Sequence, residues 1–400
     1  MREDIYIVGA SMHKFGRFPQ KDALDMCSEI VRTALADAEV TIRDIDIFAS
    51  GSLREPGSFG QRVLHEVGAT GIPVYNVANA CATGATAIRV AIMSLLAGES
   101  DAALALGFEK MGKTGLVGAA ASSLGETREF VPEGRVGAVM PVEGILGTAT
   151  NPGVFAEVGM QYARDHDGVG FEQFAKVAVK SHAHSTLNPL AQYRRPFTLE
   201  EVMNAEMIAY PNTLPMCGPT GDGAAALVLT TGDRLRGMSG AARARAVKVS
   251  ASVLMSDPYA DLQMAGPDVN TVTRLAADRA YEQAGVDPQD LDLVELHDCF
   301  ATAELVHYDN LRLCAPGEAG KFIDERGPWR DGTIPVNVSG GLVSKGHPLG
   351  CTGVANLVEV ATHLRGEAGD RQIPNATVGL THVIGLGASC AVHILERAHS

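Results

Sequence analysis

The chain contains an internal repeat, which restricts the possible folds more than any single motif does. Residues 34–48, ALADAEVTIRDIDIF, align with residues 280–294, AYEQAGVDPQDLDLV. The matched pairs are Ala38/Ala284, Val40/Val286, Asp44/Asp290 and Asp46/Asp292. Each copy has the pattern of a helix, a turn and then a strand. The repeat therefore predicts two halves of similar structure.

A second pair of segments follows the two copies in the same order. Residues 81–99, CATGATAIRVAIMSLLAGE, resemble residues 349–367, LGCTGVANLVEVATHLRGE, with Thr-Gly near the start and Gly-Glu at the end. Both segments are apolar on nearly every side, which predicts buried helices. If a pseudo-twofold axis relates the halves, the two helices meet at the centre and their N-termini open onto one cleft. Cys81 would then face the loop at 343–353, VSKGHPLGCTG.

Composition and charge limit the class of protein. The 400 residues are 46% hydrophobic and 20% charged, as in an ordinary globular chain with a substantial core. Short β-branched runs alternate with helical patterns, which favours an α/β fold. The formal net charge of −14 disfavours nucleic acid as a partner, because phosphate binding needs a basic face.

Targeting and cysteine patterns point to a reducing compartment. The start, MREDIYIVGA, lacks the apolar core of a signal peptide, and no apolar stretch of membrane-spanning length is free of polar interruption. The seven cysteines form no CxxC pair and no Cys/His spacing typical of zinc. The last residues, RAHS, carry no SKL-type signal. We expect no membrane segment, no metal, and reduced thiols in the cytoplasm.

Residues 114–221 have no partner in the repeat. We expect them to form an inserted loop domain over the cleft, between an N-terminal half (1–113 and 222–245) and a C-terminal half (246–400). The most basic stretch of the chain lies here. We interpret it as a solvated helix face in preference to a phosphate site; it comprises Lys176, Lys180, His182, His184, Arg194 and Arg195.

Three segments bring reactive side chains into turns. Cys81 begins a buried helix, where unpaired N–H groups would stabilise a thiolate nucleophile, although a buried free cysteine can also be a small hydrophobe. His347 lies on a tight turn between Gly346 and Pro348 and could take the proton of Cys81, or could simply cap or pack. His297 and Cys299 follow a strand pattern, and two residues apart on extended backbone they would point the same way.

As a set, these motifs resemble the thiolase family, and within it the sterol carrier protein type, over nearly the whole chain. The similar segments are YNVANACATGATA, ALALGFEKM, NPLAQY, CGPTGDGAAA, HDCF, NVSGGLVSKGHPLGCTG and THVIGLGAS. The resemblance implies a five-layered αβαβα thiolase fold, built from two duplicated βαβαβ halves with an inserted loop domain. It also implies a homodimer.

The resemblance further implies an activity and residue roles. The reaction would be thiolytic cleavage of a 3-oxoacyl-CoA to acyl-CoA and acetyl-CoA or propionyl-CoA, or the reverse Claisen condensation, with coenzyme A as co-substrate and no bound cofactor. Cys81 matches the acylated nucleophile, His347 the histidine that activates it, and Cys299 the acid/base of this subgroup. His297 would line a first oxyanion hole, and the amides of Cys81 and Gly385 a second.

One departure from the family pattern leaves other functions open. Val383 occupies the position of the usual second acid/base cysteine, and valine cannot transfer a proton. Cys390 does not align with the lost residue and is interpreted as core. A non-catalytic acyl-CoA-binding subunit that pairs with a small partner protein remains an alternative. Thiolase-like aldolases lack the nucleophilic cysteine, so the presence of Cys81 and Cys299 argues against that second alternative.

Overall fold

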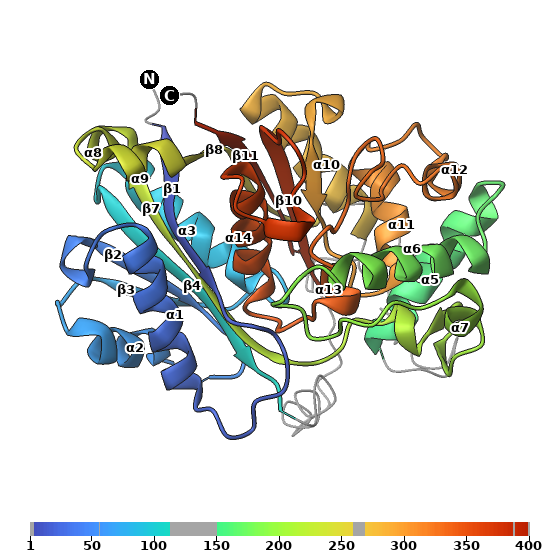
Figure 1. Cartoon of the computed structure of the whole chain (residues 1–400), viewed down its shortest axis with the longest axis horizontal. Coiled ribbons are helices and arrows are strands. Elements are labelled where there is room, and N and C mark those ends of the chain that lie inside the picture. The colour runs from blue at the N-terminus through green and yellow to red at the C-terminus, as the bar shows by residue number, and fades with distance from the viewer. Residues whose placement is uncertain (1–3, 56, 113–149, 259–268, 387–388, 399–400) are drawn as a thin grey trace.

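The computed structural model describes residues 4–55, 57–112, 150–258, 269–386 and 389–398. In these ranges the principal sheet has nine strands in the order β3-β2-β4-β7-β1-β8-β11-β10-β9 (Figure 1). The strands of its first half are β1 (Ile5–Met12), β2 (Ile47–Gly51), β3 (Val74–Val77), β4 (Ala102–Lys110) and β7 (Asp222–Thr231). Those of its second half are β8 (Val247–Ser256), β9 (Leu293–Glu295), β10 (Val378–Gly385) and β11 (Ser389–Arg397).

The halves of the sheet are joined by a short contact. β1 and β8 pair only at Tyr6↔Lys248 and Ile7↔Val247, whereas β1 pairs with β7 over its full length. The sheet therefore consists of two separate halves that meet along one narrow seam.

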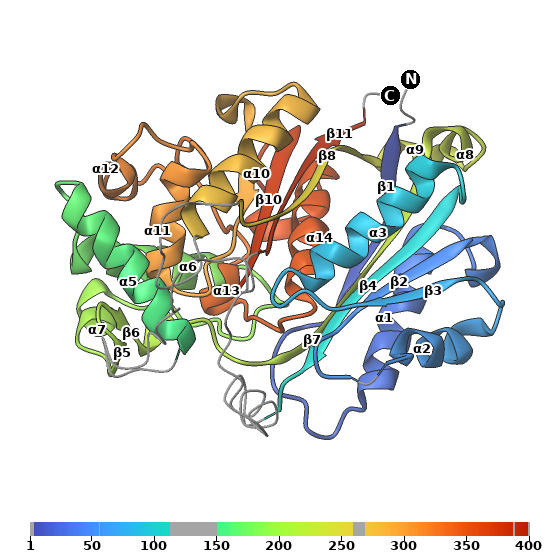
Figure 2. The same ribbon diagram turned by 180° about the vertical axis from the view of Figure 1, so that it is seen from behind.

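Helices cover and separate the two halves of the sheet (Figures 1 and 2). On the outer face of the first half lie α1 (Ala23–Asp37) and α2 (Phe59–Gly68). On the outer face of the second half lie α10 (Val269–Ala284) and α11 (Ala301–Asn310). Between the halves lie α3 (Thr83–Ala97) and α14 (Thr352–Leu364), which share one hydrophobic core with both. This is the predicted five-layered αβαβα thiolase fold.

The repeated aspartates accept equivalent hydrogen bonds in the two halves. Asp46, just before β2, accepts hydrogen bonds from Asp101 and Ala102 at the start of β4, both at 2.9 Å. Its counterpart Asp292, just before β9, accepts a hydrogen bond from the N–H of Val378 at the start of β10, at 3.0 Å. The sequence repeat therefore reflects a structural duplication.

The two central helices approach backbone to backbone near their N-termini. A Cβ atom built on Gly84 would lie 2.7 Å from the carbonyl oxygen of Gly350, and one on Gly353 would lie 2.3 Å from the nitrogen of Ala85. Both distances are too short for a side chain, so glycine is required at the crossing. This contact confirms that the N-termini of the repeated helices meet at the centre.

The segment Ala80–Ala97 is long and apolar enough, by length and composition, to cross a membrane, with a mean hydropathy of 1.6. The segment contains Arg89, so it is not free of polar interruption. Half of it is buried inside the molecule, where α3 packs against β2 and β4. The core helix of a soluble protein passes the same test.

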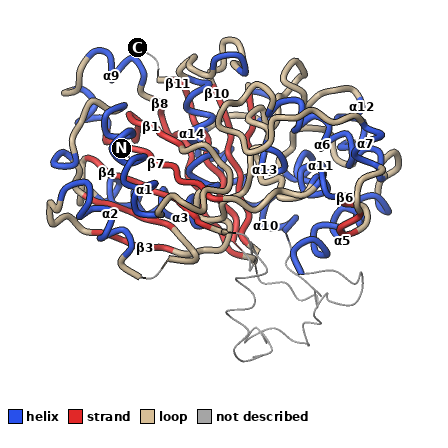
Figure 3. Tube along the Cα trace, turned by 60° about the horizontal axis from the view of Figure 1, so that its bottom comes forward, coloured by secondary structure: helices blue, strands red, loops and turns tan. Residues whose placement is uncertain are grey.

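The inserted region leaves and re-enters the sheet at one place, because Lys110 at the end of β4 pairs with Asp222 at the start of β7. Figures 1 and 3 place its helices at the opposite end of the molecule from β2 and β3. Its described elements are α5 (Thr150–Asp165), α6 (Phe171–Ser185), α7 (Leu199–Met203), β5 (Met207–Ala209) and β6 (Asn212–Thr213). The other α-helices of the described ranges are α8 (Gly232–Arg236), α9 (Gly240–Arg245), α12 (Ala319–Asp324) and α13 (Gly341–Ser344).

The prediction that the six basic residues form a solvated helix face was wrong for three of them. Lys180, His182 and His184 are buried, because α6 is packed against α7, α11, α12 and α13. Lys180 Nζ lies 2.6 Å from a carboxylate oxygen of Glu304, and both side chains are fully buried. Lys176, Arg194 and Arg195 retain greater exposure. The buried members therefore fix the insertion to the second half.

Candidate active site

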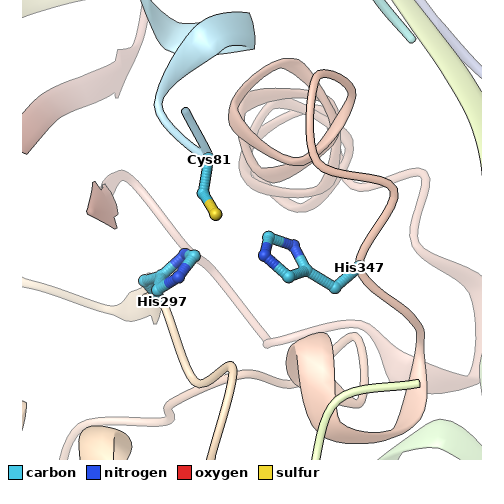
Figure 4. A group of neighbouring side chains, drawn as sticks. All are labelled: Cys81, His297 and His347. Carbon is cyan, nitrogen blue, oxygen red and sulfur yellow. The ribbon is translucent and has the colours of Figure 1, made fainter. Parts of the chain in front are cut away.

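Cys81 lies on a strained turn between β3 and α3. The preceding residue, Ala80, has a φ of 46°, a left-handed conformation that is uncommon for a residue with a side chain. The Thr83 hydroxyl stabilises this turn, since it donates to the carbonyl oxygen of Ala80 at 2.6 Å and accepts from the N–H of Asn79 at 2.7 Å. The sulfur is thereby directed toward His297 and His347 (Figure 4).

The Cys81 thiol is not ionised by its place near a helix start. Burial and then the charge of Glu109 raise its pKa to about 12, although the N–H groups of Cys81 and Leu386 both bond to the sulfur and oppose the shift. The expectation of a thiolate stabilised by the helix N-terminus was therefore wrong for the free protein. Helix α3 begins only at Thr83, and loss of hydration outweighs the nearby N–H groups. The thiol needs a base.

His347 is oriented as that base. Its Nδ1 lies 2.7 Å from Thr352 Oγ1, and the Thr352 hydroxyl donates to the carbonyl oxygen of Pro348 at 3.0 Å. Nδ1 must therefore carry the proton and donate it to Thr352, which leaves a lone pair on Nε2. Nε2 is buried and has no hydrogen-bond partner in the described part of the chain. Burial lowers the pKa of His347 to about 3, so the ring is neutral.

His297 faces the same point from the end of β9. Its ring is edge-on to that of His347, with centroids 5.0 Å apart. Its Nδ1 is also buried and finds no partner among the described residues. Burial, followed by the neighbouring His347 and His382, holds the pKa of His297 well below its usual range. Donor atoms of Cys81, His297 and His347 all lie within 4.8 Å of one another, close enough to hold a metal ion together.

Cys299 approaches the site without joining this group of three. It is 8% exposed, and burial followed by the electrostatic effects of Cys81 and Asp298 raises the pKa of its thiol well above the usual range. The Cys81 thiol thus acts electrostatically on that of Cys299. Asp298 fixes the segment, since its carboxylate accepts hydrogen bonds from the N–H groups of Leu342 and Val343 in α13 at 2.7 and 3.3 Å.

Gly385 ends β10 directly beneath the nucleophile turn. A Cβ atom there would lie 2.7 Å from the carbonyl oxygen of Asn79, so only glycine allows the approach. The N–H that bonds to the Cys81 sulfur belongs to the next residue, Leu386. Val383 is 2% exposed and packs in an apolar cluster with Ala82, so it contributes no titratable group. Cys390 is fully buried in the core, as predicted.

Sequence reasoning missed Glu109, which connects the two halves at the site. This carboxylate, 1% exposed, accepts hydrogen bonds from the N–H groups of Leu53 and Gly350, both at 3.1 Å. Gly350 directly precedes the second central helix, so Glu109 fixes the His347 loop against β4. Thr352 was also missed, although the repeated Thr-Gly pair could have indicated it. Nothing in the sequence marked Asp298 apart from its place in HDCF.

Comparison with known proteins identifies the family. Residues 5–209 match the model of the thiolase N-terminal domain, and residues 256–397 match that of the thiolase C-terminal domain. The chain therefore belongs to the thiolase family.

Its relatives include proteins with different functions. Sterol carrier protein 2 of Bos taurus is 36% identical over 99% of this chain and 73% of its own length. An acetyl-CoA acetyltransferase of Methanothermobacter thermautotrophicus is 35% identical over 98% of this chain and 100% of its own. Among solved structures, the Ltp2-ChsH2(DUF35) aldolase has a TM-score of 0.78 at 22% identity, and the match covers 98% of each chain. The last similarity supports the fold alone.

Proposed function

We propose that this protein is a thiolase that transfers an acyl group between a 3-oxoacyl-CoA and coenzyme A through an acyl-enzyme on Cys81. The observation that carries the proposal is that the Cys81 sulfur lies within 4.8 Å of a ring nitrogen of His347, whose Nε2 has no hydrogen-bond partner among the described residues. A thiol of raised pKa is a poor nucleophile alone, and a neutral imidazole beside it supplies the missing base.

In the first half-reaction, His347 Nε2 takes the proton of Cys81 as the sulfur attacks the 3-carbonyl carbon of the substrate. The N–H groups of Cys81 and Gly385 would stabilise the resulting oxyanion. When the carbonyl re-forms, the bond between C2 and C3 breaks and leaves the acyl group on Cys81. The departing enolate oxygen would accept hydrogen bonds from protonated His347 and from His297. Loss of one oxyanion donor of this kind typically costs about 3 kcal/mol of transition-state stabilisation.

Cys299 would serve both half-reactions. As a thiol it donates its proton to the enolate carbon, which gives acetyl-CoA or propionyl-CoA. The thiolate that remains takes the proton of incoming coenzyme A, whose sulfur then attacks the acyl-enzyme. Its raised pKa favours the first role, because a buried thiol remains protonated until the enolate forms. Ping-pong kinetics are expected.

The test is acyl uptake onto protein, measured with a panel of 3-oxoacyl-CoA thioesters of different chain length. Intact mass spectrometry should show one acyl group per chain before coenzyme A is added and its loss afterwards. The variant C81S should take up none and retain the wild-type thermal transition. Full turnover by C81S would refute the proposal, while a wild-type chain that never acquires an acyl group would favour the non-catalytic acyl-CoA-binding subunit.

We also propose that two copies of the chain form a homodimer. Strand β3 is the last strand of the sheet, so its outer edge is unpaired by the described strands. Tyr75 on β3 and Met93 and Leu96 on α3 are 51%, 49% and 38% exposed, and α3 contacts β3. Large apolar side chains beside a free strand edge favour burial against a second copy. All seven cysteines are free, which supports the cytoplasm as the compartment.

A further inference from the structure

We propose that Cys81, His297 and His347 form a binding site for a thiophilic divalent cation such as Zn²⁺, and that the cation and an acyl group exclude each other. The three side chains come from separate parts of the fold: the start of α3, the end of β9 and the loop before α14 (Figure 4). One thiol and two imidazoles are a ligand set that zinc accepts in proteins.

The distances suit a small tetrahedral ion. The three donor atoms lie within 4.8 Å of one another. With Zn–S and Zn–N bonds of about 2.3 and 2.0 Å, two ligands of one zinc ion lie roughly 3.3–3.6 Å apart. Contraction by about 1 Å is within the reach of small side-chain rotations. Three protein ligands would leave a fourth position for water.

One ring nitrogen of each histidine lacks a partner and can coordinate a metal ion. His347 Nε2 and His297 Nδ1 are both buried and lack a hydrogen-bond partner among the described residues. Thr352 holds the other nitrogen of His347 as an N–H donor, which is the support that zinc-ligating histidines commonly receive. A buried polar atom without a partner loses its hydration at a cost, and a metal ion offsets that cost.

The surrounding charge also favours a cation. The Glu109 carboxylate accepts four hydrogen bonds, from Ser52, Leu53, Arg54 and Gly350, which favour its ionised form although burial raises its pKa. Its negative charge acts on Cys81. On binding, the S–H bond of Cys81 breaks, a bond between sulfur and the metal forms, and the proton leaves to solvent.

Occupancy would block the reaction proposed above. The ion would hold the Cys81 sulfur and His347 Nε2, which are the atoms needed to attack the substrate and to take the proton. Zinc would therefore act as a reversible inhibitor that is competitive with the acyl donor. The competition rests on the proposed function, whereas metal binding itself does not.

Metal binding is tested directly by titration of the full-length protein with Cd²⁺ without any CoA ester. A thiolate bound to cadmium gives an ultraviolet charge-transfer absorption that imidazole and carboxylate ligands do not give. We expect this band to saturate at one equivalent and to vanish in C81S. Folded H297A and H347A should bind more than about tenfold more weakly. The matched control is C314S, since Cys314 lines a separate cavity of about 1080 Å³ and should leave the band unchanged.

A second measurement needs no variant. Excess Zn²⁺ should protect Cys81 of the wild-type protein from alkylation by iodoacetamide, while Cys314 continues to react, as followed by peptide mass spectrometry. Unchanged alkylation of Cys81, or a cadmium band that persists in C81S, would overturn the metal site. If cadmium and zinc bind as expected but no 3-oxoacyl-CoA acylates the protein, the proposed function fails and the metal site stands. If the protein is acylated but binds neither metal at Cys81, the metal site fails and the proposed function stands.

Discussion

The Nδ1 of His347 lies 2.7 Å from the hydroxyl oxygen of Thr352, and the matching threonine of the other half, Thr83, holds the turn that carries Cys81. Each hydroxyl donates to a carbonyl oxygen in the turn just before its own helix, Pro348 in one half and Ala80 in the other. The duplicated threonine thus positions the nucleophile in one half and the base in the other. The duplicated turn before each central helix therefore supports the nucleophile in one half and the base in the other.

Replacement of Thr352 tests this relationship. In T352V the ring of His347 loses the acceptor that keeps the proton on Nδ1, and Nε2 is then protonated in part of the molecules. We expect kcat for acyl transfer to fall roughly 10- to 100-fold, about 1.4–2.8 kcal/mol, with little change in KM.

The conservative variant T352S retains the hydroxyl and should recover most of the activity. The initial rate of iodoacetamide reaction at Cys81 should fall in T352V and recover in T352S. Equal kcat values for T352V and the wild type would show that the hydrogen bond does not orient the base.

The pH dependence of Cys81 alkylation follows from the raised pKa of its thiol. Iodoacetamide reacts with the thiolate, and a pKa of about 12 means that its fraction grows throughout the neutral and alkaline range. We expect the alkylation rate of the free protein to rise about tenfold per pH unit between pH 7 and 9. Background from other cysteines is subtracted with C81S. A plateau below pH 7 would mean that the thiolate is already formed.

The general architecture was accessible from the sequence because duplication leaves matched residues at fixed offsets. Asp46 and Asp292 align in the sequence and form equivalent hydrogen bonds in the structure. The thiolase motifs then predicted which residues would come together, and the side chains of Cys81, His297 and His347 do meet in the structure. Their catalytic roles stay predictions, as do those of Cys299 and Gly385.

Other features could not be deduced because they depend on packing in three dimensions. The side chain of Lys180 looks like part of a solvated face until α11 supplies Glu304 on the opposite side. The Cys81 thiol seems activated by a helix start until its burial is known. Similarly, Glu109 belongs to the site only because the loop at Gly350 folds onto it. In each case the deciding neighbour is distant in sequence.

The close crossing of the central helices predicts a stability effect. The variant G353A would place a Cβ atom 2.3 Å from the backbone nitrogen of Ala85, which cannot move without displacing α3. We expect the free energy of unfolding to fall by about 1–3 kcal/mol, as for overpacked cores. The control is G240A, since no atom lies within 4 Å of a Cβ built there. Denaturant unfolding measures both, and an equally stable G353A would contradict the crossing.

Buried neutral histidines away from the site predict a loss of stability in acid. Burial lowers the pKa of His184 and of His393 to about 3 and that of His363 to about 4. In the unfolded chain histidine titrates near 6.5, so below that pH the unfolded state binds more protons. Stability is therefore complete above pH 6.5 and is lost as the pH falls towards 4.

The free energy of unfolding should change by up to about 1.4 kcal/mol per pH unit for each such histidine. H393L removes one of these groups and should reduce this dependence between pH 6.5 and 5. Denaturant unfolding at several pH values provides the measurement. Identical slopes for the wild type and H393L would show that His393 is already protonated in the folded protein.

A charged substitution in the proposed dimer interface, beside the unpaired edge of β3, tests the homodimer. M93D places a charge on α3 at a side chain that is 49% exposed in the single chain and would be buried by a second copy. We expect light scattering to show a dimer for the wild type and a monomer for M93D, because an unpaired charge in an apolar interface loses its hydration. M207D is the matched control, because Met207 on β5 is 43% exposed and lies in the insertion. A dimer that survives M93D but is lost in M207D would move the interface to the insertion.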